Sequence, residues 1–229
     1  MDLHEALERH EVDAAAAGPL AALLEALARE PDPHTTVPAE GTVDVHVADS
    51  LAALAVPELR TARAIADLGA GAGFPGLPLA VALPRARVDL IESARRKVAV
   101  IERLIEAAGI RNARAIAARA EDWAAGEGRG AYDAVCARAV GSLALLVEYA
   151  APLLADGGSL IAWKGRRDPA EEEAGAAAAA QLGLEPAGVL AVEPYPASRD
   201  RHLHLYRKSG PTPAGFPRRP GIARKRPLA

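Results

Sequence analysis

The chain has 229 residues, half of them hydrophobic, and a formal net charge of −3, which suits one sizeable α/β domain with an extension rather than two domains. Its single cysteine, Cys136, excludes an internal disulfide framework and a multi-cysteine zinc site. Acidic residues are present at positions 2 and 5, Asp2 and Glu5, where a secretory signal needs basic residues. The longest apolar stretch, 143–155, is shorter than the ~20 residues that cross a bilayer. We therefore expect a cytoplasmic protein without a membrane partner.

Residues 2–29 are rich in alanine and leucine and predict one or two helices. Pro31 and Pro33 prevent these helices from continuing, and a loop is expected over 31–41. A second helical stretch is expected from Val43, and it carries His46. Together these segments predict an N-terminal helical extension over 1–50.

From residue 51 to residue 208, apolar segments typical of strands alternate with helical segments, which predicts a parallel sheet with helices on both faces. Strands are expected at 64–68, 88–92, 113–117, 132–138, 159–164, 189–194 and 201–208, and helices at 77–83, 94–108, 143–154 and 169–182. The last two strands are separated by too few residues for a crossover helix, so they should form an antiparallel hairpin at one edge. Five parallel strands plus a terminal hairpin is the Rossmann-like α/β sheet of class I S-adenosylmethionine-dependent methyltransferases.

The segment 209–229 is basic and proline-rich and contains no acid, so it is not expected to build a core. Its cations are Arg218, Arg219, Arg224, Lys225 and Arg226. One interpretation is a solvated, disordered tail. The other is contact with nucleic-acid phosphates, because clustered cations gain affinity through counterion release.

The glycine-rich stretch from Asp67 to Gly76 follows one expected strand and precedes an expected helix, which makes it a candidate cofactor loop. Glycines allow sharp turns and close approach of the backbone to a ligand. The spacing of Gly71, Gly73 and Gly76 also satisfies the dinucleotide-binding pattern. Asp67 favours the other ligand, because a carboxylate can meet the amino group of S-adenosylmethionine but repels a pyrophosphate.

Three further positions at strand ends are candidates for the same site. Glu92 closes the second expected strand, at the spacing that reaches a ribose; the alternative is a helix N-cap or a solvated loop, but the neighbouring glycine loop favours the ribose. The pair Ala120 and Glu121 follows the third strand, where backbone groups bracket an adenine, or where acids stabilise a helix start. Arg138 ends the fourth strand, where open α/β sheets place their chemistry, with a structural ion pair as the alternative.

Other residue types do not indicate a catalytic or metal site. The chain has no Asn/Asp-Pro-Pro-aromatic element after the fourth strand and no catalytic triad with interpretable spacing. His202 and His204 share a face of the last strand, which ordinary alternation explains, so no metal site is expected. Buried Cys136 is interpreted as an apolar filler and not as a nucleophile.

Taken in this order, the motifs resemble those of the bacterial 16S ribosomal RNA 7-methylguanosine methyltransferases, the glucose-inhibited division protein B family. The motifs are Asp67 to Gly76 with its Phe-Pro-Gly ending, His46-x-x-Asp49-Ser50, Ala137-Arg138-Ala139-Val140, Lys164-Gly165, and the tail from Thr212 to Gly221 with Lys225. The resemblance covers residues from about 45 to the end. The family's Trp-Asn and Asn-Leu-Thr element is replaced by residues 32–37, which departs from the family pattern.

The resemblance implies the ligands and the residues that bind them. S-adenosylmethionine would be held by Gly69, Phe74, Ala120, Glu121 and Arg138, beside Asp67, Gly71, Gly73 and Glu92 from the loop argument. RNA would be bound by His46, Lys164 and the five cations of the tail, although Lys164 is as easily an ordinary surface amine. The partner would be 16S rRNA or the small ribosomal subunit, and the protein is expected to be a monomer.

Guanine N7 carries an exposed lone pair and no proton, so methyl transfer to it needs no general base, and no catalytic residue is expected beyond groups that position the reactants. Arg138 should not contact N7, because a bidentate arginine contact would occupy the reacting lone pair. Alternatives are a methyltransferase acting on a small molecule or protein, a nonenzymatic RNA-binding ribosome-assembly factor, and a nicotinamide dehydrogenase.

Overall fold

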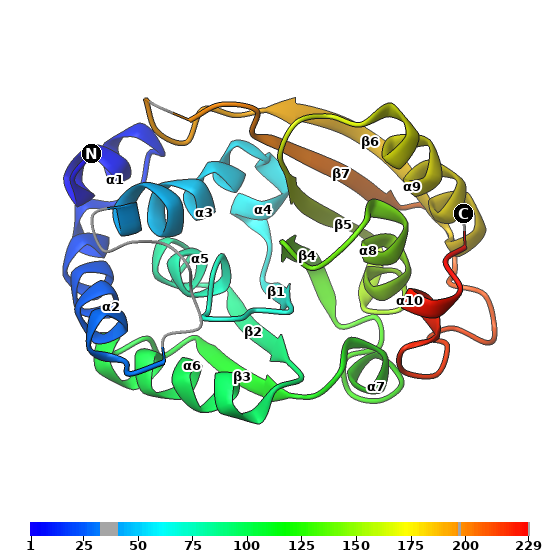
Figure 1. The fold of residues 1–229 in the computed structure, drawn as a ribbon, viewed down its shortest axis with the longest axis horizontal. Helices are drawn as coiled ribbons and strands as arrows, with labels where there is room; N and C mark the ends of the chain where they lie inside the picture. Colours follow the sequence, from blue (N-terminus) through cyan, green and yellow to red (C-terminus); the bar gives the residue numbers. More distant parts are fainter. Residues whose placement is uncertain (33–40, 197, 229) are drawn as a thin grey trace.

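A computed structural model describes residues 1–32, 41–196 and 198–228 (Figure 1). Seven strands form one sheet in the order β3-β2-β1-β4-β5-β7-β6. Their bounds are β1 Ala64–Leu68, β2 Arg87–Glu92, β3 Ala113–Ala117, β4 Tyr132–Arg138, β5 Leu154–Lys164, β6 Leu184–Ala191 and β7 His202–Lys208. Strands β1 to β5 pair in parallel, whereas β7 is antiparallel to both β5 and β6. The predicted fold class, a parallel sheet with a terminal hairpin, is confirmed.

Helices cover both faces of this sheet (Figure 1). They are α1 Leu3–Arg9, α2 Ala17–Arg29, α3 Asp49–Leu51, α4 Pro57–Thr61, α5 Gly76–Ala82, α6 Arg95–Ala108, α7 Ala120–Ala124, α8 Leu143–Ala150, α9 Pro169–Leu182 and α10 Ile222–Lys225. Alternate residues of a strand point to opposite faces. Accordingly Ile65 packs into the cluster formed with α2, α5 and α6, while Ala66 packs into the cluster formed with α8 and α9. None of the helices among the described residues is long and apolar enough to cross a membrane.

The N-terminal extension shares its core with the sheet. Leu20 and Leu23 of α2 are fully buried in the cluster that also contains Ile65. Arg103 of α6 donates two hydrogen bonds to Glu30, the residue that follows α2, at 2.8 and 2.7 Å. The helical stretch expected from Val43 is confirmed, as a π-helical segment, Val43–Ala48, that runs into α3. Most of the expected loop over 31–41 lies outside the described residues, as does most of the departure from the family pattern over 32–37.

Two strands begin five residues earlier than the sequence predicts. Strand β5 begins at Leu154 instead of residue 159, because the chain bulges between the pairs Tyr132–Leu154 and Ala134–Ser159 instead of breaking the strand. Strand β6 begins at Leu184 instead of residue 189 although it contains Pro186, because an edge strand tolerates proline. Helix α8, in contrast, ends at Ala150 and not at residue 154.

The expectation that the tail builds no core was wrong. Residues 209–228 fold back beside α8 and α9 (Figure 1), and Ala223 is buried in the cluster that contains α8. Arg218 donates through Nε to Glu148 Oε1 at 2.6 Å, and Glu148 is almost completely buried in α8. A buried carboxylate needs a compensating charge, and the tail supplies it.

Replacing Glu148 by alanine is expected to lower the free energy of unfolding by about 2 kcal/mol, because Arg218 loses its carboxylate but can turn to solvent. For a chain of this size this corresponds to a melting temperature lower by about 4–8 °C. Calorimetry and the rate of tryptic cleavage near Arg218 measure the two effects. Glu173→Ala is the control, since it removes an exposed carboxylate from α9; equal behaviour of both variants contradicts the anchoring role.

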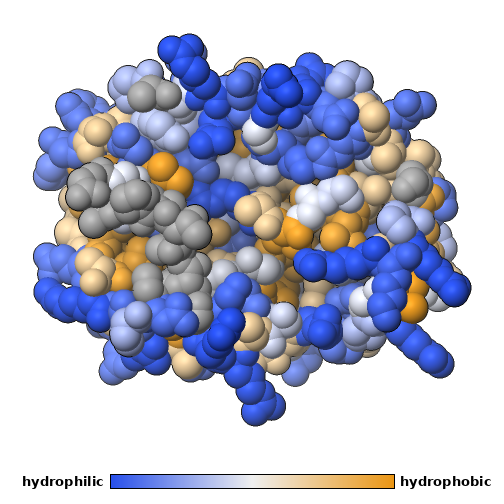
Figure 2. Space-filling view, in the orientation of Figure 1, coloured by the Kyte–Doolittle hydropathy of each residue, from blue (hydrophilic) through white to orange (hydrophobic). Residues whose placement is uncertain are grey.

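The molecular surface is consistent with apolar side chains being packed in the interior. On the face shown in Figure 2 the protruding side chains are mostly hydrophilic, and hydrophobic atoms are seen mainly in its recesses. No large hydrophobic side chain is exposed among the residues that the structure describes.

Candidate cofactor and substrate pockets

The turn after β1 is built from glycines in conformations that other residues avoid. Gly69 and Gly73 have φ angles of 65° and 95°. A Cβ atom on Gly69 would lie 2.8 Å from a methyl group of Val140, and one on Gly76 would lie 2.7 Å from Asp67 Oδ2. Glycine at these positions therefore keeps a narrow space open between the turn and its neighbours.

Asp67 lies beneath this turn and is completely buried. Its Oδ2 accepts a hydrogen bond from the Gly76 N–H at 2.8 Å, whereas Oδ1 has no hydrogen-bond partner. Burial raises the pKa of this carboxyl to about 7, although the Gly76 N–H and the charge of Arg138 oppose the shift. Asp67 thus holds the glycine-rich turn through Oδ2, and its Oδ1 is left without a hydrogen bond.

Glu92 also supports the turn. Its Oε2 accepts the Gly71 N–H at 3.1 Å, and its Oε1 accepts the Ala94 N–H at 2.8 Å, at the start of α6. Ala94 is the N-cap of α6 and the helix start has no side-chain cap, so Glu92 holds the residue before the helix but does not take the helix-capping role considered from the sequence. A contact with a ribose stays a prediction.

A pocket of about 190 Å³ lies where β1, β2 and β3 end. Three predicted cofactor residues line it: Gly69 from the turn, and Ala120 and Glu121 from the start of α7. Tyr149 of α8 and Arg224 of α10 also line it. Glu121 is buried, and its Oε1 accepts the Gly221 N–H of the tail at 2.8 Å.

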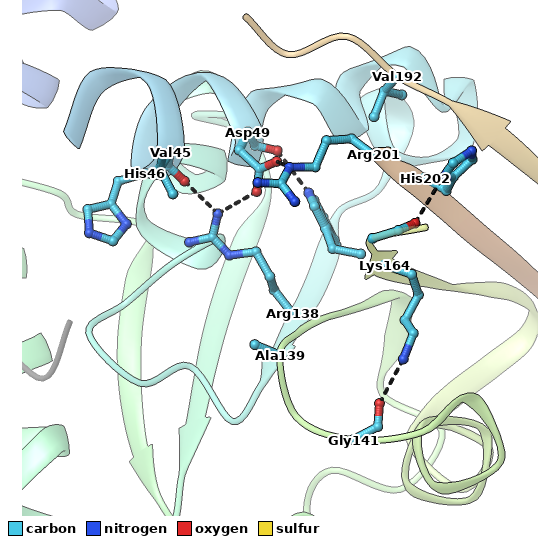
Figure 3. Close-up of a pocket in the computed structure, with 12 residues that line it drawn as sticks. Val45, His46, Asp49, Arg138, Ala139, Gly141, Lys164, Val192, Arg201 and His202 are labelled. Carbon is cyan, nitrogen blue, oxygen red and sulfur yellow. Dashed lines mark hydrogen bonds and ion pairs between the residues drawn. The ribbon is translucent and has the colours of Figure 1, made fainter. Parts of the chain in front are cut away.

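A second pocket, of about 400 Å³, opens at the ends of β4 and β5 and is lined by His46, Arg138 and Lys164, three residues predicted from the sequence (Figure 3). Arg138 donates through Nη1 to Val45 O at 2.9 Å and to Asp49 Oδ2 at 2.7 Å. The structural ion pair considered for Arg138 is therefore present, and Arg138 lines this pocket, not the smaller one.

Asp49 stands between two arginines in Figure 3. The Nε atom of Arg201 lies 3.6 Å from Asp49 Oδ1, on the side opposite to Arg138. Trp163 of β5 donates through Nε1 to the Asp49 carbonyl at 2.8 Å. Lys164 is held nearby, because its Nζ donates to Gly141 O at 3.2 Å and to Glu171 Oε1 at 2.6 Å.

The short turn 138–141 that follows β4 contributes residues to both pockets. Val140 lines the smaller pocket, while Ala139 and Gly141 line the larger one. Ala139 has a φ angle of 58°, a strained conformation for a residue other than glycine.

Phe74 and His46 link the glycine-rich turn to the larger pocket. Their rings stack with centroids 4.1 Å apart and an angle of 16° between the planes. Burial, together with the charge of Arg138, lowers the pKa of His46 to about 4, so its imidazole is neutral at pH 7. Phe74 is mostly buried and lines neither pocket.

The predicted RNA-binding cations of the tail occupy different environments. Arg218 is paired with Glu148, and Arg224 lines the smaller pocket. Arg219, Lys225 and Arg226 are exposed. His202 donates a hydrogen bond through Nδ1 to Gly165 O at 2.8 Å. The described residues contain no group of three metal-ligating side chains.

Sequence reasoning did not assign roles to Asp49, Trp163, Arg201 or Tyr149. A signal existed for Arg201, because it directly precedes the last strand. The antiparallel pairing of that strand with β5 brings it to the edge where Lys164 ends β5. Asp49 was visible within the His-x-x-Asp-Ser motif, but only the fold brings it to Arg138.

The strand order and the glycine-rich turn define the class: the fold is that of class I methyltransferases. Fibrillarin from Aeropyrum pernix, crystallised with natively bound S-adenosyl-L-methionine, matches with a TM-score of 0.54 and 20% identity, over 69% of this chain and 72% of its own. A predicted O-methyltransferase from Agrobacterium tumefaciens matches with a TM-score of 0.55 and 24% identity, over 71% of this chain and 81% of its own.

Residues 36–203 match the GidB family, rRNA small subunit methyltransferase G. The chain is 42% identical over 187 residues to the ribosomal RNA small subunit methyltransferase G of Rubrobacter xylanophilus, which covers 80% of this chain and 72% of that protein. It is also 42% identical over 199 residues to that of Pelotomaculum thermopropionicum, covering 85% and 82%. The chain belongs to this family, which confirms the resemblance and the enzyme class expected from the sequence.

Proposed function

We propose that this protein transfers a methyl group from S-adenosylmethionine to N7 of one guanine in 16S rRNA of the small ribosomal subunit. The observation that carries the proposal is the pair of pockets at the turn 138–141, one beneath the glycine-rich turn and one lined by cations. In this arrangement one turn contributes to both the proposed donor pocket and the proposed acceptor pocket. Family membership supports a ribosomal substrate over the small-molecule, protein-substrate and nonenzymatic alternatives, and a nicotinamide dehydrogenase finds no support.

The residues of the smaller pocket fit the proposed cofactor. Asp67 lines neither pocket and is completely buried directly before Leu68 and Gly69, which line the smaller one; its unsatisfied Oδ1 is the proposed partner of the cofactor's ammonium group. Gly69 leaves room beside Val140, and Ala120 and Glu121 offer backbone and carboxylate groups to a nucleoside. When bound, S-adenosylmethionine supplies the methyl group on a positively charged sulfur.

The larger pocket fits a nucleotide of RNA. Arg138, Arg201 and Lys164 outnumber the single carboxylate, Asp49, among the charged residues that line it, so a phosphate is attracted. Arg138 is held by Asp49 and by a backbone carbonyl, which keeps Nη1 from a bidentate contact with guanine. The N7 lone pair stays available for the transfer.

The residues position the reactants and do not take up a proton from N7, because N7 has none. A neutral His46 beside Arg138 adds no further positive charge at the site where the product ring becomes cationic. The contribution of the protein is orientation, which lowers the barrier by roughly 7–11 kcal/mol in favourable cases.

The test uses small subunits from a bacterial strain that lacks the modification, incubated with the purified protein and S-adenosylmethionine labelled in the methyl group. The expected result is label in 16S rRNA that digests to 7-methylguanosine, identified by mass spectrometry. Label in another nucleoside overturns the proposed position of transfer. Absence of any label, with cofactor binding intact, overturns the proposed substrate.

A further inference from the structure

Arg224 lies in the wall of the smaller pocket although it comes from the tail. Its Nη2 is 3.4 Å from Val140 O, and its guanidinium hydrogen-bonds Tyr149. Both partners also line this pocket. The sequence grouped Arg224 with RNA-binding cations, but in the structure it lines the same pocket as Glu121 and Gly69.

The backbone that carries Arg224 is fixed on both sides. Gly221 donates its N–H to Glu121 Oε1 at 2.8 Å, and Ala223 is buried against α8. Further along the tail, Gln181 of α9 donates to Leu228 O at 3.2 Å. Arg224 is thus presented to the pocket by an ordered segment, even though its own side chain is exposed to solvent.

The position of Arg224 identifies the part of a ligand that it faces. Asp67 lies beneath the turn between β1 and α5, whereas Arg224 faces the start of α7, beyond the ends of β2 and β3. In the proposed function the amino-acid part of the cofactor belongs to Asp67, which leaves the nucleoside part at α7. A guanidinium is planar, and its face packs on aromatic rings.

We propose that Arg224 is a cofactor-contacting residue that covers the nucleoside end of the pocket, so that part of the tail serves the cofactor and not RNA. This proposal rests on the proposed function. It accounts for the hydrogen bond from Gly221 to Glu121, which joins the tail to the predicted adenine-binding segment.

The test measures the binding of S-adenosylmethionine and of adenosine to the full-length protein by calorimetry. Arg224→Ala is expected to weaken both ligands by about tenfold, because both contain the nucleoside. Asp67→Asn is expected to weaken S-adenosylmethionine but not adenosine. The matched control is Arg226→Ala, which removes an exposed cation from the same tail but not from the pocket, and which should leave both affinities unchanged.

Tryptic cleavage of the tail provides a second measurement. Cofactor should slow cleavage after Arg218 and Lys225 in the unaltered protein, and should slow it much less in Arg224→Ala. Unchanged affinities and unchanged protection in Arg224→Ala overturn the proposal while leaving the proposed function intact. If the unaltered protein binds neither ligand, the proposed function fails and this proposal fails with it.

Discussion

Asp67→Asn is expected to weaken binding of S-adenosylmethionine by about a hundredfold, because the variant loses the charge that would pair with the cofactor's ammonium group in a buried site. Asparagine keeps the size of the side chain, and its amide oxygen can still accept the Gly76 N–H, so the turn should be preserved. Calorimetry measures the affinity. Asp122→Asn, which neutralises an exposed acid next to Glu121, should leave it unchanged.

The same carboxyl predicts a pH dependence of cofactor binding. Because burial raises the pKa of Asp67 to about 7, part of the free protein carries a protonated acid near neutral pH. An ammonium ligand favours the ionised acid, so affinity should increase as the pH rises from 6 to 7.5. The groups around this carboxyl are Glu92, Arg138 and Cys136. The neutral His46 does not titrate in this range.

The pH dependence of stability has the opposite sign to the pH dependence of cofactor binding. The folded protein holds a proton on Asp67 that the unfolded chain loses above its ordinary pKa of 3.8, so the cofactor-free protein loses stability as the pH rises from about 4 to 7. In Asp67→Asn, the increase in cofactor affinity with pH and the decrease in stability with pH should both be smaller. An affinity that is independent of pH in the unaltered protein would show that the acid is not the partner of the ammonium group.

Asp49→Asn is expected to reduce the rate of RNA methylation by about a hundredfold while leaving cofactor affinity unchanged. The carboxylate pairs with Arg138 on one side and faces Arg201 on the other, so its removal leaves two cations in one pocket without their shared counter-charge. The arginines then move apart, and the nucleotide loses its orientation.

Steady-state kinetics with small subunits, together with calorimetry for the cofactor, separates these effects. Asp44→Asn is the matched control, because Asp44 lies on the same helical segment but pairs with the N-terminal amine outside the pocket. Equal rates for the two variants would contradict the role of Asp49. If Asp49→Asn also lowered cofactor affinity, Asp49 would act in the smaller pocket, which is the proposed cofactor site.

The fold was largely predictable because each strand is a short apolar run bounded by turn residues. β1, β3 and β4 begin and end where the sequence indicates. β5 and β6 were predicted too short, since Gly157 and Pro186 resemble breaks, but a bulge and an edge position accommodate them. Local sequence cannot reveal such compensation.

The site was predictable only in part. The sequence placed Asp67 at the end of a strand, but not its burial, which depends on how the turn folds over it. Similarly, the ordering of the tail depends on a pair between Arg218 and Glu148, 70 residues apart. Because no local pattern links two such distant residues, the tail could only be interpreted from its composition.

The anchored tail bears on how this gene tolerates a premature stop codon. A stop directly after Lys208 leaves every strand of the sheet in place. It also leaves the buried carboxylate of Glu148 without its partner Arg218 and exposes the apolar residues that pack against Ala223. In addition, it removes the Gly221 N–H that donates to Glu121. A nonsense allele of this kind would encode a complete sheet with a weakened helix α8 and an open pocket, so its phenotype should resemble that of a deletion.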